Sequence, residues 1–220
     1  MRIIVLVAAL MLAITGTRAG QLEDAISADE NGDHATAFRL FKKLADQGDP
    51  KAQNELGTKF HLGSWGIRHD DAEAARLWRL AAEQGFAAAQ DALGFAYYRG
   101  EGLKQDYSAA AKWLKRAADQ GVDNSQNKLG FMYERGEGVP QDYVLAYMWF
   151  NLAAAQDPVF AQNRDRVAAD MTRDQIAEAQ KLTRAWAPKR ERLAPIPKRE
   201  RLAPPANPRT EQSVTGTAKP

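Results

Sequence analysis

The sequence predicts an all-α fold, a right-handed superhelix of stacked helix pairs, from three observations. One motif occurs three times, as NELGTKFHLG, DALGFAYYRGEG and NKLGFMYERGEG. The Leu-Gly pairs of these motifs lie 37 and then 36 residues apart, and flanking aspartates and alanines keep the 36-residue step. Small residues recur where neighbouring helices would touch. Repeats of this length are typical of helix-turn-helix arrays in which each unit packs against its neighbours.

Each repeat is expected to contain two helices, A and B. Asp49 and Pro50 supply the N-cap and first residue of the first helix A. A glycine-bearing loop follows, and Asp70 begins helix B, where Glu73 would complete a capping box. Left-handed glycines end the B helices, at Gly48, Gly85 and Gly121. We therefore expect a helix pair without a glycine loop at 20–48, repeats at 49–85, 86–121 and 122–157, and closing helices at 158–187 with a capping box at Thr172 and Gln175.

Packing explains why each leucine is followed by glycine. The leucine fills the core, whereas the glycine lets helix B approach closely, and the alanines at 74, 110 and 146 do the same from helix B. Larger residues are expected to fill the remaining core volume, at Leu77, Trp113 and Trp149. Trp78 lies one position later and is expected to pack against the next repeat.

Both ends of the chain differ from the repeats. Arg2 precedes an apolar run over 3–14 and then small residues, which predicts a signal peptide at 1–19 cleaved after Ala19. The alternative is an uncleaved anchor. Seven of the ten prolines and a duplicated PKRERLAP segment fall in 188–220, which predicts a disordered basic tail with eight Lys or Arg against three Glu. A periplasmic or secreted protein follows from the export signal.

The repeat pattern A-x-x-x-L-G-x-x-Y/F, then G-x-G, then D-x-x-x-A-x-x-W-x-x-x-A-A-x-x-G resembles the Sel1-like repeat, a relative of the tetratricopeptide repeat with a longer internal loop. The resemblance spans about Gln21 to Trp186 and matches best over Ala89–Gly121 and Asn124–Ala155. It implies a superhelix whose inner groove is lined by the A helices. It also implies an adaptor that binds a peptide or partner protein, for example in regulation of an envelope, exopolysaccharide or secretion complex.

Helix geometry indicates which residues would line that groove. Positions two and five after each leucine are rotated by about 200° and 140° from it, and positions two before and six after extend the surface. The rings among them are of most interest, because the repeat does not demand aromatics there; the alternative is that they pack between A helices as secondary core. The predicted groove residues are Asn54, Thr58, His61, Asp91, Phe95, Tyr98, Arg99, Asn127, Phe131, Glu134 and Arg135.

Catalytic and cofactor motifs are absent from the sequence. Without cysteine the chain has no disulfide, thiol nucleophile or zinc-thiolate site, and its three histidines lack ligand spacing. The G-x-G segments lack a third glycine and are interpreted as loops. We expect no enzyme activity, cofactor, metal or nucleic-acid partner. Two alternatives stay open: a cell-wall-associated hydrolase or β-lactam-binding protein, and a structural tether whose tail contacts anionic envelope polymers.

Overall fold

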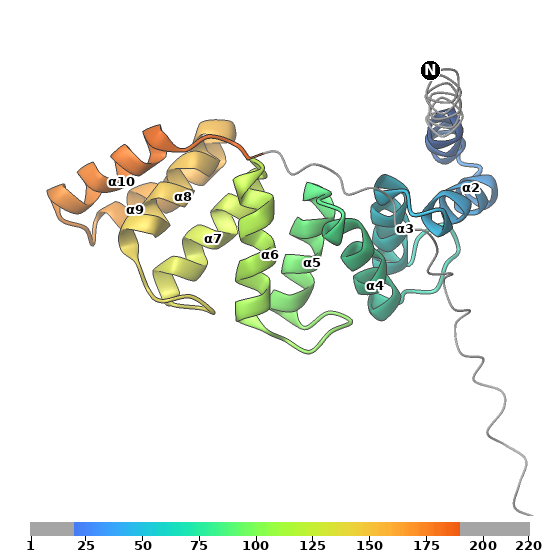
Figure 1. The fold of residues 1–220 in the computed structure, drawn as a ribbon, viewed down its shortest axis with the longest axis horizontal. Helices are drawn as coiled ribbons and strands as arrows, with labels where there is room; N and C mark the ends of the chain where they lie inside the picture. The colour runs from blue at the N-terminus through green and yellow to red at the C-terminus, as the bar shows by residue number, and fades with distance from the viewer. Residues whose placement is uncertain (1–19, 190–220) are drawn as a thin grey trace, which may run out of the picture.

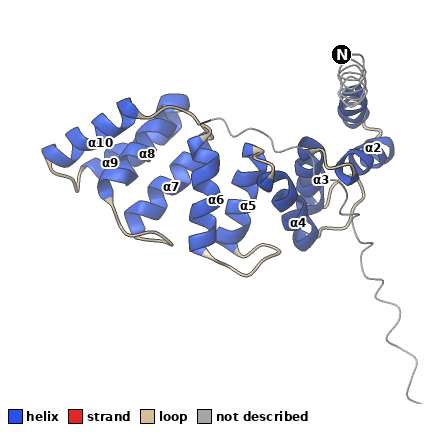
Figure 2. Ribbon diagram, in the orientation of Figure 1, coloured by secondary structure: helices blue, strands red, loops and turns tan. Residues whose placement is uncertain are grey.

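The computed structural model describes residues 20–189, and these residues form helices and loops without a strand (Figures 1 and 2). The predicted signal peptide and the predicted tail beyond Lys189 lie outside the described residues. Helical residues 20–30 precede ten further elements: α2 (His34–Asp46), α3 (Pro50–Leu62), α4 (Asp71–Glu83), α5 (Ala87–Arg99), α6 (Tyr107–Asp119), α7 (Asp123–Arg135), α8 (Tyr143–Gln156), the 3-10 turn η1 (Pro158–Phe160), α9 (Ala161–Ala168) and α10 (Arg173–Ala185).

From α2 to α9 the helices pack in chain order, each against the next, and α10 returns to pack on α8. Figure 1 shows the resulting elongated array. Helices α3, α5 and α7 are the predicted A helices, and α4, α6 and α8 are the predicted B helices. The predicted all-α solenoid fold is therefore confirmed. No helix in the described part of the chain is long and apolar enough to cross a membrane.

The helix ends follow the local signals in the sequence. Asp49, Asp70, Asp106 and Asp142 each accept a backbone N–H three residues ahead, at 2.9–3.0 Å. A left-handed glycine follows each of α2, α4 and α6, as predicted for helix terminators. The backbone φ is 84° at Gly48, 92° at Gly85 and 96° at Gly121. The capping box at Thr172 forms in both directions. The one predicted at Asp70 forms only half, because the Glu73 carboxylate pairs instead with Arg76 at 2.6 Å.

Each Leu-Gly glycine is the point of closest approach between the two helices of its repeat. A methyl group on Gly57 would lie 2.9 Å from the Trp78 indole, and one on Gly94 would lie 2.6 Å from Leu114. Gly130 meets the Phe150 ring at 2.5 Å in the same way. The prediction that glycine permits this approach is confirmed.

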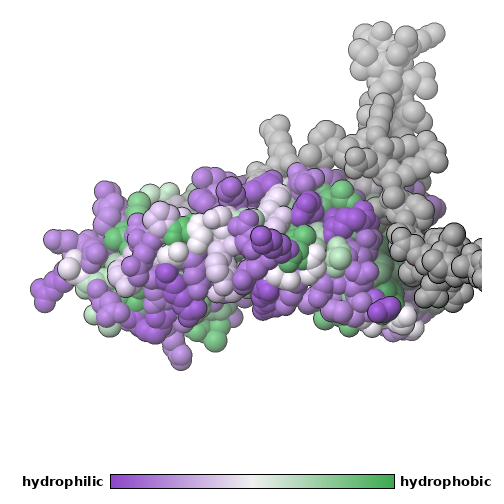
Figure 3. Space-filling model, turned by 90° about the horizontal axis from the view of Figure 1, so that it is seen from below, coloured by the Kyte–Doolittle hydropathy of each residue, from purple (hydrophilic) through white to green (hydrophobic). Residues whose placement is uncertain are grey.

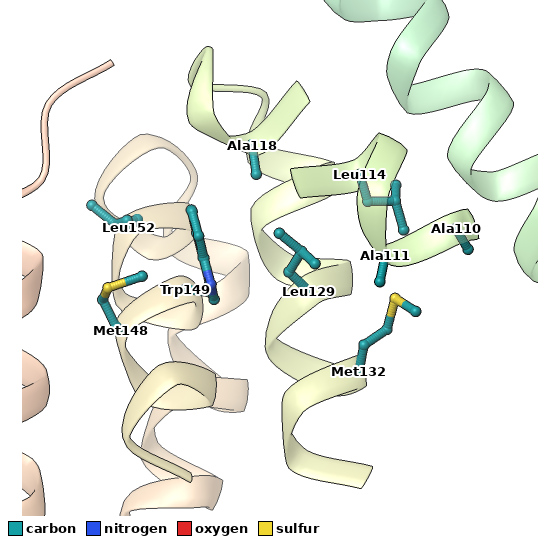
Figure 4. Packing of buried hydrophobic residues seen from close by; sticks show 9 residues of the cluster. All are labelled: Ala110, Ala111, Leu114, Ala118, Leu129, Met132, Met148, Trp149 and Leu152. Carbon is teal, nitrogen blue, oxygen red and sulfur yellow. The ribbon is translucent and has the colours of Figure 1, made fainter. Parts of the chain in front are cut away.

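The buried side chains form a series of clusters between consecutive helices rather than one central core. Figure 4 shows one of them, in which Leu114 and Ala118 of α6 meet Leu129 of α7 and Trp149 of α8. Leu77 and Trp149 are buried as expected. Trp113 is only half-buried, with the Arg116 guanidinium 4.7 Å from its ring centre, so the prediction that it fills the core is wrong. Its neighbour Leu114 occupies the fully buried site instead.

Trp78 shares a buried cluster with Ala89 and Leu93 of the following α5, as its offset position predicts. It also packs on Gly57 of its own repeat. Trp78 thus packs against both its own repeat and the following one. Phe150 does the same, since it meets both Gly130 and the α9–α10 cluster through Val167.

The glycine loops join each repeat to the one before it. A methyl group on Gly102, in the second repeat, would overlap the Asp71 carbonyl at the start of α4. One on Gly138, in the third repeat, would overlap the backbone of Tyr107 at the start of α6. Both glycines also have φ near 70°. The second glycine of G-x-G is therefore required by close backbone contact as well as by loop conformation.

The first loop contacts the preceding helix pair through Trp65, whose ring stacks on that of His34, the first residue of α2, with ring centres 6.3 Å apart. Trp65 has φ 60° and stacks on Phe41 of α2 with ring centres 5.5 Å apart. Its indole N–H donates to Asp29, which also pairs with Lys59 Nζ at 2.9 Å. The one-residue insertion in this loop thus places a ring against the N-terminal helix pair.

Candidate binding surface

The predicted groove residues lie mainly at the junctions between consecutive A helices. We name their combined surface on α3, α5 and α7 the A-helix surface; Lys128 belongs to it as well, for reasons given below. Arg99 and Arg135 are exposed, Asn54 is buried, and the other predicted members are half-buried. Contacts across the α5–α7 and α7–α9 junctions bring many of them together. The structure does not bring the α3 members into direct contact with those of α5.

Two of the residues that lie two positions before a leucine, Asp91 and Asn127, connect their repeat to the next A-type position along the array, whereas Asn54 bonds only within α3. The Ser125 hydroxyl donates to the Asp91 carboxylate, and Asn163 Nδ2 donates to Asn127 Oδ1 at 2.8 Å. Asn54 is 8% exposed, and its backbone carbonyl accepts a hydrogen bond from the Thr58 hydroxyl at 3.1 Å. Burial raises the pKa of the Asp91 carboxyl above its ordinary value. These polar groups are occupied by the array itself, so they contribute little free hydrogen-bonding capacity to a ligand.

Phe95 and Phe131 occupy equivalent positions in consecutive repeats, and both are half-buried. Phe95 packs against the cluster that contains Met132 of the next A helix. Phe131 meets Phe150 edge-to-face, with ring centres 5.0 Å apart. Arg99 and Arg135, one turn later on the same helices, lie 5.5 and 5.3 Å from these ring centres. The rings therefore belong partly to a secondary core and partly to the surface.

Tyr98 is the centre of the α5–α7 junction. Its hydroxyl donates to Glu137 Oε2 at 2.7 Å, and its ring lies 5.0 Å from that of Tyr107. Burial, together with this hydrogen bond to a carboxylate, raises the pKa of Tyr98 to about 12. Lys128 Nζ lies 3.2 Å from the centre of the Tyr98 ring, in a cation–π contact.

Lys128 is a member of this surface that the sequence did not reveal. It lies immediately before the leucine, where the other two repeats have Glu55 and Ala92, so the repeat pattern gives no signal for a cation there. Burial lowers the pKa of Lys128, and Arg135 and Arg99 lower it further, against the opposing effect of Glu137. The A-helix surface is thus more cationic at the α5–α7 junction than the predicted residues alone indicate.

The charged residues at the edge of this surface form ion pairs that differ in distance and exposure. Arg99 lies 3.5 Å from Glu101, and Arg135 lies 3.7 Å from Glu137. The two arginine side chains are each 56% exposed, so such pairs contribute little to stability. Glu134 is paired more closely, in a two-point contact with Arg166 of α9.

The first repeat presents different chemistry. His61 Nδ1 lies 2.6 Å from Asp71 Oδ1, and His69 Nε2 lies 3.0 Å from Asp71 Oδ2. Burial alone would raise the pKa of Asp71, but the hydrogen bonds and charges of the two histidines together lower it. His61 also contacts the Trp78 ring, at 5.5 Å between centres. Within residues 20–189 no group of three His, Cys, Asp or Glu side chains is arranged to hold a metal ion.

A ladder of buried glutamines was also missed from the sequence. Gln53, Gln90 and Gln126 are at most 4% exposed, and each donates at 3.2 Å to a carbonyl of the preceding B helix or of α2. Each also accepts, at 2.8–2.9 Å, from a glutamine at the end of its own helix B, which is Gln84, Gln120 or Gln156. The available signal was the repeat spacing, which is 37 and 36 residues for Gln53, Gln90 and Gln126 and 36 residues for Gln84, Gln120 and Gln156. The ladder fixes how consecutive repeats pack, and thereby the relative positions of the A helices.

Comparison with known proteins matches this architecture. The family model described as the Sel1 repeat matches residues 27–49, 50–86, 87–122 and 123–158. The first match is short and falls on the helix pair that lacks a glycine loop. A search of curated proteins finds no match to the chain.

The solved structures that are similar to the chain include two repeat proteins of known origin. A Sel1 repeat protein from Oxalobacter formigenes is 31% identical with a TM-score of 0.63, and the match covers 68% of this chain and 45% of that protein. The protein c5321, a protective antigen of uropathogenic Escherichia coli with an SLR fold, is 28% identical with a TM-score of 0.52, and the match covers 69% of this chain and 40% of that one. The chain thus matches less than half the length of each.

Four family matches cover more than half of the sequence, and the similar structures have the same repeat architecture. Sel1 repeats generally mediate protein–protein interaction, and proteins built from them are typically non-catalytic scaffolds. The chain belongs to the Sel1 repeat family.

Proposed function

We propose that this protein is a non-enzymatic adaptor of the bacterial envelope that binds a peptide or partner protein on its A-helix surface. The observation that carries the proposal is the arrangement of Phe95 and Phe131, whose half-exposed rings recur one repeat apart, each beside an exposed arginine. Partly exposed aromatics next to arginine are enriched among residues that dominate binding energy at interfaces. The ladder and the glycine loops hold these rings on a rigid array, which limits the entropy lost on binding.

The location is inferred from the start of the chain. Residues 1–19 have the charge, length and small-residue pattern of a cleaved export signal, and the similar structures come from bacteria. An exported adaptor without cysteine would be indifferent to an oxidising compartment. We infer that the partner belongs to an envelope complex, such as one that controls secretion or exopolysaccharide production.

Site-specific photocrosslinking would test the surface. A photoreactive amino acid replaces Arg99 or Arg135, which are exposed, so packing is preserved. Lys112, an exposed residue of helix B α6, is the matched control position. We expect the two A-helix positions to crosslink one common envelope protein and the control not to. Equal crosslinking from Lys112, or none from the A helices, would contradict the proposal.

Point variants then measure the binding with the purified partner. Substituting Phe95, Tyr98 and Phe131 together would confuse binding with folding, because Phe131 packs on Phe150. Arg99→Glu with Arg135→Glu is the cleaner change. We expect a loss of affinity of tenfold or more, which is about 1.4 kcal/mol, with an unchanged unfolding midpoint.

The tether model is tested separately. The predicted tail has eight Lys or Arg against three Glu, whereas residues 20–187 have 20 Lys or Arg against 25 Asp or Glu, and this opposition of charge favours contact between the tail and anionic polymers. Deleting residues 191–220 removes most of the basic charge but leaves the contact between Lys189 and Asp119 intact. If the tail is a tether, the deletion releases the protein from the envelope fraction while crosslinking at Arg99 persists.

A further inference from the structure

The α5–α7 junction carries three cations, each over an aromatic ring: Lys128 over Tyr98, Arg99 over Phe95 and Arg135 over Phe131. Lys128 lies on the face of the Tyr98 ring, and the side chains of Arg99 and Arg135 are close enough to lower the pKa of Lys128. Among the described residues Lys128 forms no ion pair, in contrast to Lys59, Lys115 and Lys181 elsewhere in the array. A partly buried ammonium group without a carboxylate partner is costly, because desolvation is not offset by a close opposite charge.

The two nearby glutamates, Glu101 and Glu137, compensate only part of the charge of the three cations. Glu137 already accepts the Tyr98 hydroxyl at 2.7 Å and faces Arg135 at 3.7 Å. Glu101 faces Arg99 at 3.5 Å. These arginine pairs are long and exposed, so a carboxylate from outside can replace or join them at little cost.

The sign of the charge here is opposite to that of the array as a whole. Residues 20–187 contain 20 Lys or Arg and 25 Asp or Glu, a net charge of −5. A cationic junction on an acidic protein discriminates between partners, because an acidic segment is attracted to this junction and repelled by the rest of the surface. Figure 3 views the molecule from below Figure 1, the side of the glycine loops, and shows a mainly hydrophilic face with small, separate hydrophobic groups. The three cations of the junction therefore select a partner by charge as well as by apolar contact.

The chain itself does not supply a matching segment at its C-terminus. Residues 190–220 contain seven Lys or Arg and three Glu, so the predicted tail has the same sign of charge as the junction. The charge of the tail therefore disfavours it as the occupant, and a carboxylate of a partner has the complementary chemistry.

We propose that the α5–α7 junction binds an acidic segment of the partner, with a carboxylate received by Lys128, Arg99 and Arg135 and a neighbouring apolar side chain against the half-buried ring of Phe95. This inference rests on the proposed function, because it names the chemistry of the partner for the same surface. The Asp or Glu side chain of the partner, or its C-terminal carboxylate, would give Lys128 the ion pair that the array lacks.

Peptide selection on the purified full chain tests this proposal. The probe is a phage-displayed library of random 12-residue peptides with free C-termini, selected on the wild type and on two variants. The first variant is R99Q/K128Q/R135Q. The second, K51Q/K104Q/K112Q, removes three exposed lysines of the array at the same change in net charge. The basic tail is present in all three proteins, so peptides that bind the tail are enriched equally on each.

We expect Asp and Glu to be enriched about threefold or more over the input on the wild type and on the K51Q/K104Q/K112Q control, and to return to input levels on R99Q/K128Q/R135Q. A synthetic copy of the best peptide should bind the junction variant at least about tenfold more weakly than the control in fluorescence anisotropy, and raised salt should reduce this difference.

Each other outcome overturns a defined part of the reasoning. Selection of apolar peptides without acidic residues refutes the carboxylate site and leaves the proposed function standing. Acidic enrichment that persists in R99Q/K128Q/R135Q also refutes the site, since the tail or another surface must then be responsible. If no peptide is enriched on any protein, both the carboxylate site and peptide binding by the A-helix surface are wrong.

Discussion

Replacing Gln90 by glutamate puts the glutamine ladder to a quantitative test. Gln90 is completely buried; its Nε2 donates to the Ala82 carbonyl at 3.2 Å and its Oε1 accepts from Gln120 at 2.8 Å. Glutamate has the same shape, so Gln90→Glu leaves no cavity. Its protonated form keeps both hydrogen bonds, whereas its ionised form turns an oxygen toward the Ala82 carbonyl and buries a charge.

The magnitude follows from the cost of keeping that carboxyl group protonated. An ordinary glutamate has a pKa of about 4.3, so protonation at pH 7 costs about 1.4 kcal/mol for each of roughly 2.7 pH units, or about 3.7 kcal/mol. This is the expected loss in the free energy of unfolding of Gln90→Glu at pH 7. The loss should shrink by about 1.4 kcal/mol per pH unit on acidification and approach zero near pH 4.3.

Urea denaturation followed by circular dichroism, from about pH 4.5 to about pH 7.5, measures this dependence. Gln162→Glu is the matched control, because Gln162 follows an alanine in α9 as Gln90 does in α5 but is exposed. The control should show no pH-dependent loss. If Gln90→Glu is as stable as the wild type at pH 7, or if its loss does not change with pH, Gln90 is not the buried hydrogen-bonding link between α4 and α5 described above.

Three further predictions concern the loops and the A-helix surface. Gly102→Ala should destabilise the protein by at least about 2 kcal/mol more than Gly66→Ala in urea denaturation, because both have positive φ but only Gly102 abuts backbone; equal losses would show that the loop contact is unimportant. Since burial raises the folded-state pKa of Asp91, its ionised form opposes folding at neutral pH; Asp91→Asn should therefore raise the melting temperature at pH 7 and lose that advantage on acidification below the folded pKa. Tyr98 should ionise near pH 12, so an ultraviolet titration of Tyr98→Phe should lack a late phase that the wild type shows.

The fold was predictable because its signals are local and repeated. Helix ends depend on capping aspartates and left-handed glycines, and the close approach of two helices depends on a missing side chain, as at Gly94 beside Leu114. Such rules act within one repeat and are written three times in the sequence. They did not decide which of two adjacent B-helix positions is more deeply buried, and the bulkier Trp113 was wrongly preferred to Leu114.

The candidate site was less predictable because it depends on contacts between repeats. Helix phase gives the direction of a side chain such as Asp91. It does not show that Ser125 of α7, the next A helix, donates a hydrogen bond to that carboxylate. The glutamine ladder was hidden because Gln90 and Gln126 look like surface residues until their carbonyl partners are placed. Lys128 occurs once, so no repeat pattern marks it.

The contact between each glycine loop and the start of helix B in the preceding repeat determines where additional repeats can be inserted. The loop of a duplicated 87–122 unit placed after residue 122 would find a helix start like the one that Gly138 already meets at Tyr107. A copy placed before residue 50 would separate Trp65 from Phe41, the ring on which it stacks. Repeats can therefore be duplicated in the middle of the chain without loss of these contacts. The junction between the N-terminal helix pair and the first repeat cannot be separated in the same way, because it depends on the contact between Trp65 and Phe41.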